Sequence, residues 1–274
     1  MQQRAGVVTV NARNDPVVLI KQVSVSIIFV MRAEEQSDKI ITLLKDSKKT
    51  KPVKCPYLPD KVFIQRYFVH NDLSEYEFDY LLSQGWRKFG YYFFKPECPE
   101  CFGCTPVRVL AEEYSPSKSQ KRVLRKNNVT DVFMAQNSFS EERYKIFEKH
   151  SEIRFNQKTT RKDFGYNFCI SAVPSFVMEY KIAEKLFGTG YIDSSSEGLS
   201  SVYFAFDPDY SFLSPGILSS IVEIYTAKNL GKKYYYLGYY VKNNKTMEYK
   251  LNFSPYELYD WAEKKWEKVK SPRG

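Results

Sequence analysis

Apolar and polar residues alternate in several stretches of the chain after residue 55, and in other stretches apolar residues recur every three or four positions. The first spacing is typical of strands and the second of amphipathic helices. Alternation predicts strands at residues 61–69, 86–96, 106–114, 127–134 and 233–241. Helical spacing predicts helices at residues 73–86, 115–128, 140–155 and 214–231, and a short one at 254–266. Residues 166–173, 176–195 and 198–209 predict three to four antiparallel strands joined by short turns.

This order of elements predicts an α+β fold in two domains. We place an N-terminal domain with a cysteine site at residues 31–137 and a second domain, with a mainly antiparallel sheet, at residues 138–274. Residues 1–30 differ in composition from the rest of the chain, and Met31 begins a more ordinary start, so we expect a non-native or loose extension there. The apolar stretch within this extension is too short to span a bilayer, and we expect no membrane partner.

The composition is that of a globular protein with an anionic partner. Hydrophobic residues make up 43% of the chain and aromatic residues 16%, and the formal net charge is +9. Residues 45–54 hold five lysines, which predicts a solvated linker or an electrostatic arm. The predicted helix at 115–128 carries five cations without an intervening acid: Lys118, Lys121, Arg122, Arg125 and Lys126. Such a run either faces solvent or contacts phosphates.

Four cysteines are the strongest chemical signal. Cys98, Cys101 and Cys104 form a C-x2-C-x2-C run, and Cys55 lies upstream in "CPYLPD". Thiolates at this spacing converge on one centre, and four of them suit a zinc ion or an iron–sulfur cluster. Buried free thiols or a disulfide are the alternatives, and the spacing does not separate zinc from a cluster. Cys169 lies in the apolar run "YNFCISAV" and is predicted to be a core residue.

Few other side chains offer chemistry. The two histidines, His70 and His150, stand alone in the sequence, which makes a histidine base a weak candidate. The chain has neither a phosphate-binding loop nor a dinucleotide motif, so we expect no nucleotide cofactor. Asp207 in "FAFDPDY" ends a predicted strand and is the candidate catalytic carboxylate; the alternative is a turn former before Pro208.

Five separated motifs resemble those of a known family. In order they are "CPYLPD", "GWRKFGYYFFKPECPECFGCTPVRV", "SPSKSQKRV", "LSSVYFAFDPD" and "YYYLGYYVKNNKTMEYKLNFSPYELY". They resemble the aminoacyl-tRNA–protein transferases, and most of all the bacterial aspartate/glutamate leucyltransferase branch, which is related to arginyl-tRNA–protein transferase. The resemblance runs from about residue 55 to residue 266 and implies that the second domain is a GNAT-like acyltransferase.

The resemblance also implies an activity. Such a cytoplasmic enzyme would move an aminoacyl group from leucyl-tRNA to the N-terminal amine of proteins beginning with Asp or Glu, which marks them for degradation by the N-degron pathway. It implies a site for the acidic first residue formed by Arg87, Arg108, Ser119, Gln120, Lys121 and Arg122. We assign tRNA contacts to Lys118, Arg125, Tyr239, Lys245 and Lys250.

Two other interpretations stay open. The donor could be arginyl-tRNA with the same acceptor, since an arginyl side chain needs a buried carboxylate and the chain offers Asp193, Asp207, Asp209 and Glu248. A non-catalytic metal-ribbon protein that binds nucleic acid would share the cysteines and the basic helix. Such a protein would have no need for the "FDPD" and "YLGYYV" strand ends.

Overall fold

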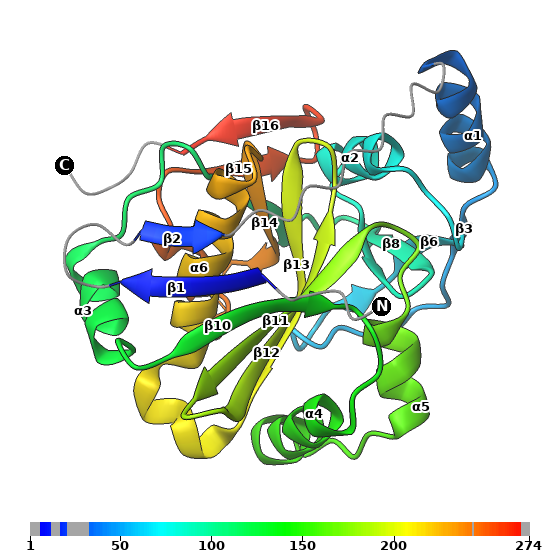
Figure 1. The fold of residues 1–274 in the computed structure, drawn as a ribbon. Coiled ribbons are helices and arrows are strands. Elements are labelled where there is room, and N and C mark those ends of the chain that lie inside the picture. Colours follow the sequence, from blue (N-terminus) through cyan, green and yellow to red (C-terminus); the bar gives the residue numbers. More distant parts are fainter. Residues whose placement is uncertain (1–5, 12–16, 21–32, 243, 270–274) are drawn as a thin grey trace.

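The computed structural model describes residues 6–11, 17–20, 33–242 and 244–269. A ten-stranded sheet forms its centre (Figure 1). In spatial order its strands are β16 (Lys265–Lys268), β15 (Tyr256–Asp260), β9 (Cys104–Leu110), β14 (Tyr234–Val241), β13 (Gly198–Phe206), β12 (Lys185–Ser194), β11 (Ser175–Ile182), β10 (Asp131–Gln136), β1 (Gly6–Asn11) and β2 (Val17–Ile20). Neighbouring strands are antiparallel except for β13 and β14, which run parallel.

Two smaller sheets come from the segment between residues 48 and 96. The strands of the four-stranded sheet, in spatial order, are β3 (Lys48–Lys49), β6 (Gln65–Val69), β8 (Tyr92–Pro96) and β7 (Arg87–Phe89). Strands β4 (Val53–Lys54) and β5 (Val62–Phe63) form a two-stranded ladder.

Helices cover both faces of the large sheet. They are α1 (Ala33–Lys45), α2 (Glu75–Ser83), α3 (Lys118–Lys126), α4 (Glu141–Phe155), α5 (Arg161–Phe164) and α6 (Pro215–Asn229), with a π-helical turn η1 (Gly165–Cys169) and two 3-10 turns, η2 (Pro208–Leu213) and η3 (Glu248–Asn252). On β11, Val177 packs with α4 residues, whereas the next residue, Met178, packs with α6 residues. Because successive side chains of a strand point to opposite faces, α4 and α6 lie on opposite sides of the sheet.

Local signals position three of these helices. Ser74, Ser117 and Ser140 precede α2, α3 and α4, and each side chain accepts a hydrogen bond from the backbone N–H three residues later. A serine at this position typically stabilises a helix by about 1 kcal/mol. The helix α2 then packs on the small sheet in a separate core that includes Phe78, Trp86 and Phe93.

The predicted α+β class with a mainly antiparallel sheet is confirmed. Three predicted elements are wrong. Residues 86–96, predicted as one strand, form two antiparallel strands, β7 and β8. Residues 166–173 contain the end of η1 rather than a strand, because Phe164 and Phe168, four positions apart, enter one aromatic cluster under α4. Residues 254–266 form the hairpin of β15 and β16 rather than a helix, because β15 pairs with the free edge of β9. Pairing with a distant strand outweighs local helical spacing here.

The proposed domain boundary near residue 137 does not separate the sheets. Strands β9 and β10 precede this boundary, yet both pair in the ten-stranded sheet. Within the extension at residues 1–30, the described strand β1 pairs with β10 and with β2. The other residues of the extension lie outside the described ranges. No helix in the described part of the chain combines the length and apolar character needed to cross a bilayer.

Candidate active site

A cavity of about 280 Å³ lies where the small sheet meets the large one. Strand β7 contributes Arg87 and Lys88 to its wall, β13 contributes Ser201 and Val202, and β14 contributes residues 237–239. Other large side chains of the lining are Tyr57, Phe63, Phe89, Phe94, Met247 and Lys250. None of the described residues that line it is Asp or Glu. A mostly apolar cavity with a few cations suits a ligand that carries an anionic group.

The cavity lies where β13 and β14 separate. The parallel pairing runs only from Gly198 opposite Tyr234 to Ser200 opposite Tyr236. Beyond this point the register of β14 against β9 shifts between Tyr236 and Gly238, and Gly238 has a φ of +83°. Glycine adopts this conformation without the steric cost that other residues meet. A bulge of this kind bends its strand, which accounts for the space between β13 and β14.

Arg87 is a buried cation on the wall of this cavity. Its Nη2 donates a hydrogen bond to the backbone oxygen of Ser201 in β13, so the guanidinium bridges the small sheet and the large one. Its Nη1 is buried and has no hydrogen-bond partner among the described residues. Burial lowers the pKa of Arg87, because the charged form loses solvent. A buried donor without a partner costs free energy that an incoming anion would offset.

Lys88, the next residue, forms an ion pair inside the protein. Its Nζ lies 2.9 Å from Oδ2 of Asp193, and both side chains are almost fully buried. The hydroxyl of Ser171 donates to Oδ1 of the same carboxylate at 3.1 Å. Asp193 is therefore neutralised by Lys88 and is not available as the partner of a second cation.

Lys250 lies beside Arg87 on the cavity wall. Its Nζ donates to the backbone oxygen of Tyr239 at 2.8 Å. A Cβ placed on Gly238 would stand 3.5 Å from this Nζ and 3.7 Å from Nη2 of Arg87, so both cations approach the same glycine. Burial, followed by repulsion from Arg87, lowers the pKa of Lys250 to about 7. The amine is therefore partly neutral near pH 7.

Tyr239 lines the cavity, and a hydrogen bond holds its ring in place. Its hydroxyl donates to the backbone oxygen of Gly85 at 2.8 Å, which holds β14 to the turn before β7. This contact gives Tyr239 a structural task beside the tRNA contact that we predicted for it.

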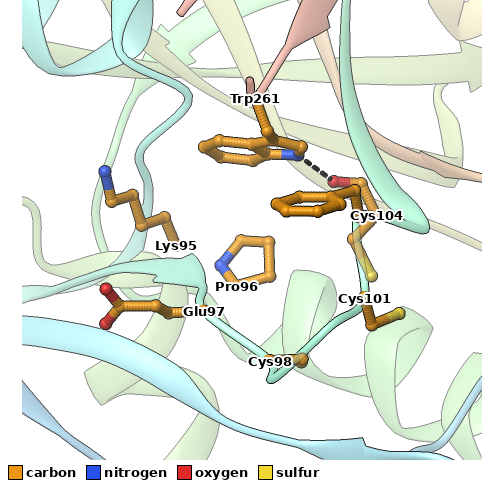
Figure 2. Close-up of a pocket in the computed structure, with 8 residues that line it drawn as sticks. Lys95, Pro96, Glu97, Cys98, Cys101, Cys104 and Trp261 are labelled. Atoms are coloured by element: carbon orange, nitrogen blue, oxygen red, sulfur yellow. Dashed lines mark hydrogen bonds between the residues drawn. The ribbon is translucent and has the colours of Figure 1, made fainter.

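A second cavity, of about 160 Å³, shares the lining residues Pro96 and Cys104 with the first, and Figure 2 shows its lining. Cys98, Cys101 and Cys104 line it, and Nε1 of Trp261 donates to the backbone oxygen of Cys104 at 3.0 Å. Cys104 also lines the larger cavity, so the cysteine loop forms part of the candidate active-site wall.

The four predicted metal ligands influence one another. Burial and then the sulfurs of Cys98, Cys55 and Cys101 raise the pKa of Cys104 to about 12. A metal ion or cluster would reverse this effect, because it favours the thiolate. The donor chemistry of four thiols suits zinc or an iron–sulfur cluster. However, no three Cys, His, Asp or Glu side chains within the described ranges are arranged as ligands of one ion, so the shared centre stays a prediction.

Cys169 lies outside this group. It ends η1 and packs half-buried against the aromatic cluster under α4, as expected for a core residue.

The other residues predicted for the acidic substrate lie elsewhere. Arg108 is buried, with Nε 2.6 Å from Oε2 of Glu257 and its guanidinium stacked on Tyr234 and Trp266. Gln120 is buried, accepts from the backbone N–H of Ser117 and donates to the backbone oxygen of Asn252. These internal partners occupy both side chains, and neither lines the large cavity.

Exposed cations gather on α3. Lys118, Lys121, Arg122 and Arg125 are exposed, as is Ser119, whose hydroxyl bonds that of Ser117. Figure 1 shows α3 at the opposite side of the view from β8, which adjoins the large cavity. The structure therefore does not bring residues 119–122 together with Arg87. Lys245 is exposed and does not line that cavity either.

Asp207 caps the start of the turn η2. Its side chain accepts from the backbone N–H of Asp209 at the start of η2, and it forms an ion pair with Lys149. It does not line the large cavity, and this arrangement corresponds to the turn-forming alternative.

The sequence pattern did not predict that Ser201, Gly238 and Lys250 line one cavity. A local signal exists for only one of them: Gly238 interrupts the aromatic run "YYYLGYYV", and a glycine inside a strand marks a bulge or a close approach.

Comparisons with known proteins confirm the family resemblance. The family model described as the N terminus of arginine-tRNA-protein transferase matches residues 53–122, and the model of its C terminus matches residues 142–260. An aspartate/glutamate leucyltransferase of Campylobacter jejuni is 34% identical over 211 residues, which cover 74% of this chain and 88% of the relative. That of Marinobacter nauticus is 31% identical over 215 residues, with 76% and 90% covered.

Among solved structures, the C-terminal domain of a putative lysylphosphatidylglycerol synthetase from Agrobacterium fabrum has a TM-score of 0.41 and 10% identity, over 80% of this chain and 81% of that one. This likeness is too weak to indicate the fold or the function of the chain.

Proposed function

We infer the reaction from family membership: this chain belongs to the arginine-tRNA-protein transferase family and is an aminoacyltransferase. We propose that it transfers leucine from leucyl-tRNA to the N-terminal amine of proteins that begin with Asp or Glu, in the cytoplasm, and that its products enter the N-degron pathway. The aspartate/glutamate leucyltransferases similar to it support this choice of donor and acceptor.

The observation that carries the acceptor assignment is the buried, partnerless Nη1 of Arg87 on the cavity wall. The carboxylate of an Asp or Glu side chain would give this nitrogen a charge-assisted hydrogen bond. Of the residues predicted for the acidic first residue, Arg87 has both the burial and the free donor that this role needs. We therefore assign recognition of the acidic side chain to Arg87.

The lining of the cavity favours leucine over arginine as the donated residue. Apolar groups such as Phe89, Phe94 and Leu237 can surround a leucyl side chain, and no Asp or Glu belongs to the described lining. An arginyl side chain would meet the cations Arg87 and Lys250 without a carboxylate to balance them. Like charges in a poorly solvated site repel strongly.

The exposed cations of α3 support contact with the phosphates of tRNA. Lys118, Lys121, Arg122 and Arg125 lack ion-pair partners among the described residues. We propose that α3 holds the tRNA body while its aminoacyl end reaches the cavity. We also propose that the four cysteines hold zinc or an iron–sulfur cluster beside that cavity.

The test is a side-by-side transfer assay. The purified chain is given leucyl-tRNA or arginyl-tRNA, with peptides beginning Asp, Glu, Asn or Lys, and the acylated peptide is quantified by mass spectrometry. We expect transfer of leucine to the Asp and Glu peptides. Faster transfer from arginyl-tRNA would overturn the leucine assignment alone, whereas no transfer from either donor would overturn the proposed function.

A further inference from the structure

We propose that the side-chain amine of Lys250 is the general base that accepts the proton of the substrate's α-ammonium group. This inference rests on the proposed function, since it concerns the amine that the aminoacyl group is transferred to. It gives Lys250 a role different from the tRNA contact predicted from the sequence.

The geometry holds the amine at the reaction cavity. Lys250 belongs to η3, and its Nζ is fixed by the 2.8 Å hydrogen bond to the backbone oxygen of Tyr239. That bond uses one N–H of the amine. A neutral amine so bound keeps its lone pair for a proton arriving from the cavity. The nearby Gly238 lacks a Cβ, so the approach from β14 stays open.

The other titratable groups on the cavity wall are unsuited to this role. Arg87 remains a cation at any working pH, and the amine of Lys88 is engaged by the buried carboxylate of Asp193 at 2.9 Å. Burial raises the pKa of the Tyr239 hydroxyl, which also donates to the backbone oxygen of Gly85, so this group holds its proton at neutral pH. Cys104 is a predicted ligand of the metal or cluster, and Tyr57 lies two residues from the predicted ligand Cys55, so neither is assigned to proton transfer. No Asp or Glu of the described residues lines the cavity. Among the described lining residues, Lys250 is therefore the titratable group that can accept a proton from the cavity.

The electrostatic surroundings agree with this assignment. Besides Lys250, the charged residues that line the cavity are Arg87 and Lys88 from β7. Burial raises the pKa of the Tyr239 hydroxyl on β14, so it stays neutral. On its own turn, Glu248 is exposed. Burial and Arg87 lower the pKa of Lys250 to about 7. A base titrating near 7 is matched to an α-ammonium group, whose ordinary pKa is about 8.

In the proposed step every proton and every electron pair has an acceptor. Neutral Lys250 takes one proton from the α-ammonium group and becomes an ammonium ion. The freed amine attacks the ester carbonyl, forming the C–N bond, and the C–O bond to the tRNA ribose breaks with its electron pair going to oxygen. A second proton from the attacking nitrogen passes to that ribose oxygen, which leaves a neutral amide. Lys250 then returns its proton to solvent.

The test compares Lys250→Arg, Lys250→Ala and the exposed control Lys162→Arg in single-turnover transfer to an Asp-starting peptide. Lys250→Arg keeps the positive charge but offers no base. We expect it to lower the transfer rate by about 100-fold or more while the KM of both substrates changes little. The wild-type rate should rise with pH through about 7, whereas the rate of Lys250→Arg should follow the peptide amine near pH 8. Added ethylamine should partly restore peptide acylation in Lys250→Ala and not in Lys250→Arg.

A Lys250→Arg variant that transfers at the wild-type rate would overturn the proposal and indicate a charge contact. If ethylamine does not rescue Lys250→Ala and the KM of this variant for charged tRNA is raised, the proposal is overturned as well. Thermal melts of each variant separate these outcomes from misfolding, and rescue of Lys250→Ala requires a folded protein. If the wild-type chain transfers nothing, the proposed function falls as well; if only the Lys250 results disagree, the function stands.

Discussion

Glu223 should make the protein less stable as the pH rises from 5 to 8. It lies on α6, is fully buried, and its Oε2 accepts a hydrogen bond from Tyr235 at 2.5 Å. Ser201, like Tyr235, stabilises the charged carboxylate, but burial outweighs both. A Cβ at Gly190 would lie only 2.7 Å from Oε1 of Glu223. Burial raises the pKa of Glu223 from its usual 4.5 to about 7. The neighbouring Tyr180 and Tyr235 hydroxyls have pKa values raised well above 10 by burial, so they do not titrate in this range.

The sign follows from the raised folded-state pKa. Below pH 4.5 the carboxyl is protonated in both states and folding is not penalised. As the pH rises through the folded pKa near 7, the unfolded chain is already ionised and the folded protein must bury a charge. Linkage then removes roughly 2 to 3 kcal/mol of free energy of unfolding between pH 5 and pH 8.

The assay is urea unfolding of the wild type, Glu223→Gln and the exposed helical control Glu152→Gln at pH 5 to 8. Glutamine cannot ionise, so the difference in free energy of unfolding between Glu223→Gln and wild type should shift by roughly 2 to 3 kcal/mol in favour of the variant. This difference cancels the titration of all other groups and any constant cost of the amide. The Glu152→Gln difference should stay flat. A Glu223→Gln difference that does not change with pH would show that Glu223 does not titrate between pH 5 and 8 in the folded protein.

Three further predictions concern the cysteines, the basic surface and the N-terminal extension. The purified chain should carry bound zinc or iron, and Cys101→Ser should lose most of it by elemental analysis; a metal-free wild type prepared without chelators would contradict a shared centre. The affinity for charged tRNA should fall with salt, with a slope in log K against log salt of roughly −0.7 per phosphate neutralised on a single strand, and a flat response would mean that α3 does not bind tRNA. A chain beginning at Met31 should keep its transfer rate, because the cavity lining starts after residue 55, and loss of transfer would show that the extension supports the site.

Local interactions explain which parts of the fold could be predicted from the sequence. The serines at 74, 117 and 140 cap helices through contacts within three residues, so the pattern contains the whole signal. The strand β15 could not be predicted this way, because its partner β9 lies far away in the chain and local helical spacing pointed elsewhere.

The candidate site was only partly predictable for the same reason. Arg87 was predicted from motif resemblance, and the structure supplies what the motif lacked, a buried nitrogen without a partner among the described residues. Arg108 also carries the right charge, but its tie to Glu257 depends on the pairing of β9 with β15. The approach of Lys250 to Arg87 depends on a bulge at Gly238 and on the divergence of β13 from β14. Only the assembled sheet determines that geometry.

The proposed function depends most on recognition of the acidic first residue by Arg87. The most direct measurement is the ratio of kcat/KM for a peptide beginning with Asp to that for the same peptide beginning with Asn, in the wild type, Arg87→Gln and Arg122→Gln. Misfolded protein lowers both values equally and leaves the ratio unchanged. Loss of a buried partner of a carboxylate costs about 2 kcal/mol or more, so the ratio should fall at least about 30-fold in Arg87→Gln and stay near the wild-type value in Arg122→Gln. An unchanged ratio in Arg87→Gln, with a collapsed ratio in Arg122→Gln, would contradict the assignment to Arg87 and place recognition on α3.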